Sequence, residues 1–117
     1  MNYFEKIDKA KTARGTLKLL GKMTSDEIAN YLRNRSITGT SSYKYCPIAN
    51  LLNRKTKNRV DVMYSKVEIT RAFFNPKLYS TPDSVLEFIT EFDKGNKYED
   101  LHSLDAPRLK VFSPIQF

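Results

Sequence analysis

The sequence contains very few of the residues on which most metalloproteins and nucleophilic enzymes depend. Its 117 residues include one cysteine, Cys46, and one histidine, His102. One cysteine cannot form an internal disulfide or supply a cysteine-rich metal site, and the cysteine and histidine together match no zinc-ligand spacing. We therefore expect no metal and no other cofactor.

Long apolar runs and glycine-rich loops are also missing. No apolar stretch approaches the roughly 18 residues that a membrane-spanning helix needs, and the charged start MNYFEKIDKAK lacks the apolar segment of a secretion signal. The chain has four glycines, and none belongs to a phosphate-binding loop, a nucleophile elbow or a dinucleotide fingerprint. These absences predict a soluble cytoplasmic protein.

Two catalytic arrangements deserve comparison with simpler explanations. Cys46 precedes a predicted helix, whose dipole is expected to lower the pKa of the thiol, with His102 as a base. Nothing in the sequence brings these two residues together, and cap cysteines are more often inert. Glu87 and Glu91 lie one helical turn apart, a spacing more typical of a solvated acidic face than of general acid–base catalysis. We expect that the protein is not an enzyme.

What the chain has in excess is positive charge. Twenty basic and thirteen acidic residues give a formal net charge of +7. Residues 33–72 carry nine basic and two acidic side chains, whereas residues 73–101 carry three basic and six acidic ones. A basic field attracts anionic partners. The same composition is also common in lysine-rich proteins from AT-rich genomes that bind no nucleic acid.

Apolar residues recur at helical spacing in four stretches, 2–13, 24–35, 47–55 and 81–95. The second stretch begins with a capping box, in which Thr24 and Glu27 each satisfy a free backbone N–H group. The third begins with Pro47, which has no N–H group to lose at the first helical position, after Cys46 as the cap.

Other residues mark where helices should begin or end. Gly39 is expected to adopt a left-handed backbone after the second helix, and Gly95 is expected to end the last one. Thr81 is the expected cap of the last helix, with Pro82 in its first turn. Residues 16–20, TLKLL, are either a short helix or a connector.

Two short segments alternate as β-strands do. In residues 60–64, Val60, Val62 and Tyr64 share one face, and residues 67–71 alternate in the same way, so a hairpin with a turn at 65–66 is expected. A hairpin alone is marginal in water, so it needs a third strand or packing against Phe88 and Phe92.

The expected fold is therefore α+β, with about four helices packed on an antiparallel hairpin or three-stranded sheet. We interpret residues 1–117 as one domain. Within it, residues 1–22 form an N-terminal helical extension, residues 23–101 the core and residues 102–117 an irregular tail. Residues 108–112, RLKVF, are a candidate edge strand within that tail.

The stretch GTSSYKYC, residues 39–46, is the candidate binding surface. A helix N-terminus offers backbone N–H groups to an anion, and exposed tyrosines can stack on bases. The predicted ligand-binding residues are Ser41, Ser42, Tyr43, Lys44, Tyr45, Arg33, Arg35 and Arg54. In the alternative interpretation, Tyr43 and Tyr45 pack over the helix while the serines only shape the loop.

Three motifs carry a resemblance to a known family. They are the Asp-Glu-Ile-Ala helix at 26–29, the Cys-Pro-Ile-Ala helix start at 46–49 and the Phe-Asp-x-Gly end at 92–95. Across residues 25–101 the chain resembles a small family, without an established activity, from actinobacterial genomes and mobile elements. It departs from that family in its richness in lysine and asparagine and in additional segments at both ends. The resemblance implies a phage or mobile-element accessory protein, of the kind used against host defences, that acts by binding.

Two functions follow as hypotheses. In the first, the protein binds an anionic ligand, either a nucleotide or a nucleic acid, and can sequester a host nucleotide signal. In the second, it is an inhibitor or adaptor that binds an acidic host protein through its basic region. Either one is compatible with a homo-oligomer. A hydrolase that uses Cys46 or the carboxylates ranks third.

Overall fold

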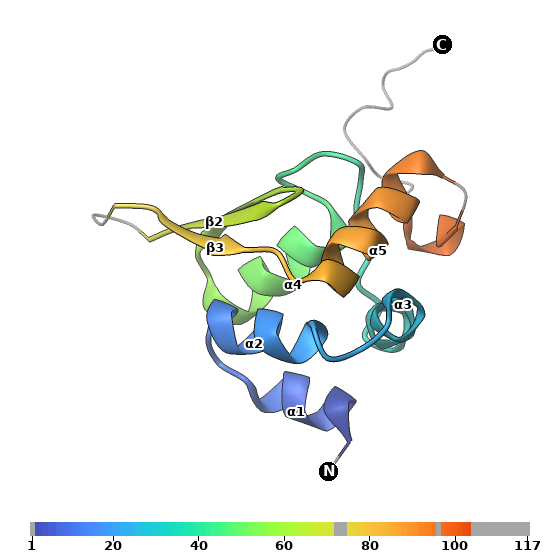
Figure 1. The fold of residues 1–117 in the computed structure, drawn as a ribbon, viewed down its shortest axis with the longest axis horizontal. Helices are drawn as coiled ribbons and strands as arrows, with labels where there is room; N and C mark the ends of the chain where they lie inside the picture. Colours follow the sequence, from blue (N-terminus) through green and yellow to red (C-terminus); the bar gives the residue numbers. More distant parts are fainter. Residues whose placement is uncertain (1, 72–74, 96, 104–117) are drawn as a thin grey trace.

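A computed structural model describes residues 2–71, 75–95 and 97–103 of the chain. It shows an α+β domain in which five α-helices, a short 3-10 helix and a three-stranded antiparallel sheet share one core. Figure 1 shows the sheet on one side of the molecule, with the helices beside and below it. None of the helices in these three ranges combines the length and the apolar character needed to cross a bilayer.

The first helix, expected over residues 2–13, ends earlier than predicted: α1 is Tyr3–Lys9, and a separate helix, α2 (Ala13–Leu20), follows it. The backbone becomes extended at Ala10, and Thr12 caps a new helix by accepting a hydrogen bond from Gly15 N at 3.0 Å. A threonine in this position competes with continuation of the preceding helix, because its side chain satisfies a free N–H group of the next one. Residues 16–20 are therefore helical and belong to α2.

Helix α3 (Ser25–Asn34) begins as predicted, with both hydrogen bonds of the capping box between Thr24 and Glu27 present. Its end differs from the prediction. Ser36, with φ of 56°, adopts the left-handed backbone that was expected of Gly39. Gly39 is needed for space instead, because a Cβ atom there would lie 2.3 Å from the carbonyl oxygen of Tyr45.

Helix α4 (Pro47–Thr56) confirms Cys46 as its cap and Pro47 in its first turn. Helix α5 (Asp83–Lys94) ends at Gly95, whose φ of 74° confirms the predicted left-handed stop. The predicted cap of α5 is wrong. The cap position is Pro82, without a side-chain hydrogen bond, and the hydroxyl of Thr81 is buried without a partner among the described residues.

The sheet contains β1 (Arg59–Met63), β2 (Lys66–Thr70) and β3 (Lys77–Ser80), in the order β1-β2-β3. The predicted hairpin is confirmed, but Met63 pairs with Lys66, so the turn is at Tyr64 and Ser65, one residue earlier than predicted. Tyr64 therefore leaves the strand face and donates a hydrogen bond from its hydroxyl to Asp93 on α5.

A third strand supplies the support that the hairpin needs. Val60, Val62, Val67 and Ile69 are buried in the same core as Phe88 and Phe92 of α5, and β1 packs against α4. Strand β3 pairs with β2 through Val67 opposite Tyr79 and Ile69 opposite Lys77. The candidate edge strand at 108–112 lies outside the described residues.

The last described segment attaches to the start of the loop before α4. After the 3-10 helix Glu99–Leu101, Gly39 N donates a hydrogen bond to Leu101 O at 2.9 Å and Ser103 N donates one to Gly39 O at 2.7 Å. The ring of His102 stacks on Phe92 with 3.8 Å between centroids. Residues 97–103 therefore connect α5 to the loop between α3 and α4.

Candidate anion-binding site

The loop that contains the predicted ligand-binding residues runs beside the edge of β1. Val62 N donates a hydrogen bond to Tyr43 O at 2.8 Å, which holds the loop against the strand. Tyr43 and Tyr45 are 52% and 53% exposed, so about half of each residue is open to solvent. The Lys44 ammonium lies 5.9 Å from the centroid of the Tyr43 ring. Loop and tyrosines are thus accessible to a ligand.

The first turn of α4 is not accessible in the way that the sequence suggested. Cys46, Pro47, Ile48 and Ala49 are all buried, and the Cys46 sulfur accepts a hydrogen bond from Ala49 N at 3.4 Å. An anion therefore cannot reach the backbone N–H groups of this turn in the conformation seen here. Contact of a ligand with the exposed side chains of the loop stays a prediction.

Burial also reverses the expectation for the thiol. It raises the pKa of Cys46 to about 11, and the backbone N–H groups of the helix, which act in the opposite direction, offset only part of this rise. The predicted lowering of the Cys46 pKa is wrong, because removal from water disfavours the thiolate more than the helix end favours it. At neutral pH the thiol stays protonated.

The three predicted arginines are dispersed. Arg33 Nε lies 2.6 Å from a carboxylate oxygen of Asp100, and Arg35 forms an ion pair with Asp8 of α1. Hydrogen bonds from these arginines hold the pKa of both carboxyls below their ordinary value. Arg54 is exposed on α4 and lines neither of the two pockets described below. The structure does not gather these arginines around the tyrosines.

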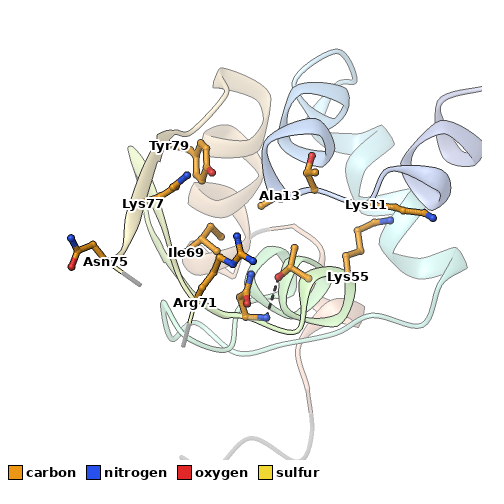
Figure 2. A pocket seen from close by; sticks show the side chains of 11 residues that line it. Lys11, Ala13, Lys55, Ile69, Arg71, Asn75, Lys77 and Tyr79 are labelled. Atoms are coloured by element: carbon orange, nitrogen blue, oxygen red, sulfur yellow. Dashed lines mark hydrogen bonds between the residues drawn. The ribbon is translucent and has the colours of Figure 1, made fainter. Parts of the chain in front are cut away.

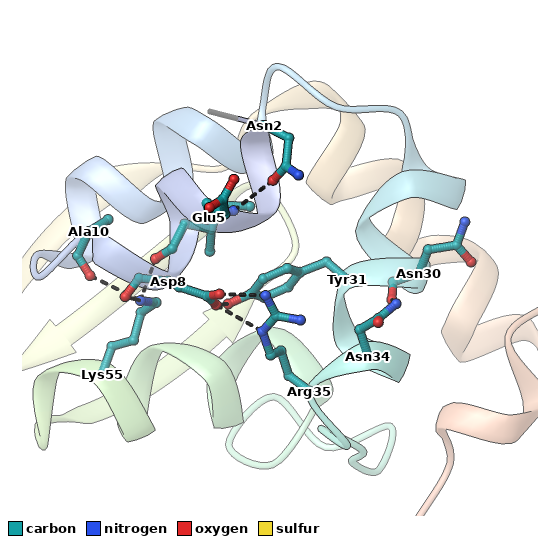
Figure 3. A network of polar contacts seen from close by, with 10 residues as sticks. Asn2, Glu5, Asp8, Ala10, Asn30, Tyr31, Asn34, Arg35 and Lys55 are labelled. Atoms are coloured by element: carbon teal, nitrogen blue, oxygen red, sulfur yellow. Dashed lines mark hydrogen bonds and ion pairs between the residues drawn. The ribbon is translucent and has the colours of Figure 1, made fainter.

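Asp8 is the centre of a polar network that fixes α1 to the rest of the domain (Figure 3). It accepts a hydrogen bond from the hydroxyl of Tyr31 at 2.7 Å in addition to its pair with Arg35. Burial, together with the hydrogen bond to Asp8, raises the pKa of Tyr31 well above its ordinary value. The positive charge of Arg35 therefore serves internal structure.

Lys55 completes this network from α4. Its ammonium donates hydrogen bonds to backbone carbonyls at the end of α1, among them Ile7 O and, at 2.9 Å, Ala10 O. Cations suit a helix C-terminus because the last carbonyl groups lack helical partners. Desolvation lowers the pKa of Lys55, and the nearby charge of Asp8 opposes this shift. Lys55 thus connects α1 and α4.

Beside Lys55 opens a cavity of about 550 Å³, which we call the basic pocket (Figure 2). Four of the side chains that line it are basic, and none of its described lining residues is acidic. The lining residues are Lys11, Thr12, Ala13, Lys55, Thr56, Asn58, Ile69, Arg71, Asn75, Lys77 and Tyr79. In the described ranges, Lys11 and Lys77 form no ion pair.

The sheet register explains why β3 contributes to this pocket. Directly opposed residues in an antiparallel pair point to the same face. Lys77 opposes Ile69, and Tyr79 opposes Val67, so Lys77 and Tyr79 lie on the face that carries the buried side chains. Lys66 belongs to the alternating set on the other face. A short, exposed third strand thus places a lysine and a tyrosine at the opening between sheet and helices.

A second cavity, of about 370 Å³, adjoins the loop and is lined by Lys44, Tyr45, Asn50, Asn53, Arg59, Val60 and Asp61. Its charges are mixed, because Asp61 is buried there with its carboxylate 3.5 Å from Arg59 Nε. The side-chain amide nitrogens of Asn50 and Asn53 donate to backbone carbonyls. This cavity is therefore less suited to an anion than the basic pocket.

Sequence reasoning missed the basic pocket. The signal in the sequence is the basic segment 33–72, which includes Lys55, Asn58 and Arg71 of the pocket. Lys11 had been assigned to the first helix, and Lys77 and Tyr79 to no element at all. To place these residues in one pocket, a reader of the sequence would need to predict both the break before α2 and strand β3.

Comparison of the chain with family models, with curated protein sequences and with solved structures gives no match. The likeness of residues 25–101 to a family thus remains a prediction. Within the described parts of the chain, no three histidine, cysteine, aspartate or glutamate side chains come together as a metal site requires.

Proposed function

We propose that this protein is a non-catalytic binding protein for an anionic ligand, and that the basic pocket is its binding site. One observation carries the proposal. Four basic side chains from α2, α4, β2 and β3 and the segments next to them line a single cavity whose described lining includes no carboxylate. Like charges brought together repel one another, and a bound anion relieves this repulsion.

The size of the pocket supports a compact ligand. A volume of about 550 Å³ falls within the range of about 300 to 1,000 Å³ that is usual for small-molecule sites. Ala13 and Ile69 supply apolar wall, while threonine and asparagine side chains supply hydrogen-bonding groups. A nucleotide or a short part of a nucleic acid matches this mixture of charge, apolar surface and polar groups.

The surroundings of the candidate nucleophile favour binding over catalysis. Cys46 is buried with a raised pKa. The Nε2 atom of His102 lies 3.0 Å from Phe92 O, and its ring stacks on Phe92. Both residues thus serve packing. Sequestration of a host nucleotide signal, the form that the first hypothesis from the sequence takes, is compatible with such a site.

Binding to an acidic protein is the second candidate. Tyr43, Tyr45, Met63, Tyr64 and Leu78 are large apolar or aromatic side chains that are between 41% and 60% exposed. Exposed apolar side chains next to basic ones are typical of protein interfaces. This function predicts that the protein captures a macromolecule but no small anion.

Calorimetric titration with ATP and with inorganic tripolyphosphate, at low and at physiological salt, tests the first function. We expect binding to weaken by about tenfold when Lys11→Gln and Lys77→Gln are combined, since both lysines line the pocket. The matched control combines Lys18→Gln and Lys66→Gln, which remove the same charge from exposed positions that do not line it. If neither anion binds, or both double variants lose affinity equally, the basic pocket is not the site.

A further inference from the structure

The two ends of the basic pocket differ in chemistry. Figure 2 shows Lys11 and Lys55 together at one end, and Tyr79 at the other, where Lys77, Ile69 and Arg71 also lie. The first end lies at the start of α2, where Lys11 and Thr12 precede the first helical residue, Ala13. The second end belongs to β3 and has the single aromatic ring among the described lining residues.

The lysine end suits a phosphate group. Lys11, the residue before the cap of α2, and Lys55 of α4 both line this end. The Lys55 ammonium donates hydrogen bonds to carbonyl oxygens at the end of α1, so a phosphate here competes with these carbonyls for it. The positive end of the α2 dipole has the same sign as these lysines and adds to their field. A phosphate placed here makes contacts that a neutral or cationic group cannot make.

The tyrosine end suits a planar ring. Tyr79 is half-buried and packs against the core, and its pairing with Val67 fixes the backbone that carries it. The neighbouring Ile69 is buried at the floor of the pocket. An aromatic face beside an aliphatic side chain does not stabilise a bare polyphosphate, whereas any nucleobase can stack on it.

Because the aromatic ring lies at one end of the pocket and Lys11 and Lys55 at the other, we propose that the ligand is a free nucleotide. Its base lies against Tyr79 and Ile69, and its phosphates point toward the two lysines. This inference rests on the proposed function, because it assigns the chemical class of the anion in the same pocket. A longer strand is the less suitable ligand. Helix α5, which follows β3, exposes the acidic side chains of Asp83 and Glu87, and these would repel the phosphates of a strand that continued in that direction.

The test distinguishes the contribution of the Tyr79 ring to affinity from the contribution of the basic side chains. ATP, inorganic tripolyphosphate and a 15-residue thymidine oligonucleotide are titrated, with EDTA present, into the wild type, Tyr79→Leu and Tyr79→Phe. We expect the wild type to bind ATP about tenfold more tightly than tripolyphosphate, which lies within the range that one stacked base contributes. Tyr79→Leu should remove the difference by weakening ATP alone, and Tyr79→Phe should preserve it.

A second measurement needs no variant. Nuclear Overhauser effects between the Tyr79 ring protons and the base protons of ATP should appear in the wild-type complex, which keeps the inference testable if Tyr79→Leu fails to fold. Equal affinity for ATP and tripolyphosphate without such contacts overturns the inference while the proposed function stands. Tighter binding of the oligonucleotide than of ATP does the same. Absence of binding to all three probes overturns the proposed function itself.

Discussion

The end of α3 and the basic pocket both carry clustered positive charge, but the two regions use it differently. At the end of α3, Arg33 and Arg35 each meet a carboxylate from a distant segment, Asp100 and Asp8. In the basic pocket no described lining residue is acidic. The positions of the acids, more than the number of bases, therefore decide which cations are available to a ligand.

The comparison has a physical basis in how cations are neutralised. An internal carboxylate holds an arginine side chain in one geometry and lowers the local potential that a ligand would feel. Lysines without such a partner keep their field. A segment of high positive charge in the sequence can thus hold two surfaces of opposite use, one that builds the fold and one that binds.

The largest expected effect concerns the closed start of α4. Because burial raises the Cys46 pKa from 9.0 to about 11, the thiolate fraction at neutral pH falls by about a hundredfold. Labelling by a thiol reagent at pH 7.5 should therefore be at least about a hundredfold slower in the native protein than in denaturant. Comparable rates in the two states would show that this helix start is open.

The next prediction contrasts a pocket lysine with a paired arginine. Lys77→Glu places a carboxylate in the basic pocket and should weaken binding of ATP by about tenfold or more, as expected for charge reversal at a binding site. Arg33→Glu breaks the pair with Asp100 but should change the affinity by less than about twofold. Calorimetric titration of both variants with ATP measures the two affinities, and thermal unfolding verifies that both variants are folded. A larger loss from Arg33→Glu would reverse the assignment of the two regions.

A smaller effect is expected for the network that fixes α1. Asp8→Asn weakens the bonds with Tyr31 and Arg35 and should lower the free energy of unfolding by about 1 kcal/mol, since the Asp8 side chain is 40% exposed and partly screened. ATP affinity should stay within about twofold, because the hydrogen bonds of Lys55 to the α1 carbonyls are retained. Glu5→Gln, on the same helix, is the control that should change neither quantity appreciably.

The same network predicts a pH dependence. The hydrogen bond from Arg35 is the main cause that holds the pKa of Asp8 below its ordinary value of 3.8. The carboxylate therefore stabilises the folded state above pH 3.8 and loses this effect as the pH falls through the lowered pKa. Urea unfolding should show a difference between wild type and Asp8→Asn that is constant near neutrality and disappears in strong acid. A difference that grows toward acid would contradict this sign.

The smallest effects are expected in the exposed loop. Tyr43→Ala and Tyr45→Ala remove side chains that are about half exposed, so each should change the free energy of unfolding by less than about 0.5 kcal/mol. Affinity for ATP should also stay within about twofold. A loss of tenfold or more in either variant, with the fold intact, would return the binding site to the loop that the sequence suggested.

The local features of the fold could be predicted from the sequence because single residues cause them. The capping box of Thr24 and Glu27, Pro47 at a helix start and the left-handed Gly95 all follow from backbone hydrogen bonding within a few residues. The break before α2 was missed because Thr12 serves as a cap inside a run that is otherwise helical in pattern.

The basic pocket was harder to predict because it depends on contacts between distant segments. Strand β3 has four residues and only half-buries Tyr79, so it leaves almost no alternation in the sequence. The pairing of Arg35 with Asp8 and the burial around Cys46 are likewise results of packing. The sequence therefore shows where basic residues are concentrated, but not which of these residues line an open cavity.

The single ammonium group of Lys55 donates hydrogen bonds to carbonyl groups at the end of α1, and the same side chain lines the basic pocket. Any anion that draws this group toward itself loosens its bonds to the α1 carbonyls. By thermodynamic reciprocity, the free energy by which a bound anion weakens the attachment of α1 equals the free energy by which the attachment of α1 weakens anion binding. If the basic pocket binds an anion as proposed, the N-terminal helix is coupled to its occupancy, and hydrogen exchange of the helix amides should change when the anion binds.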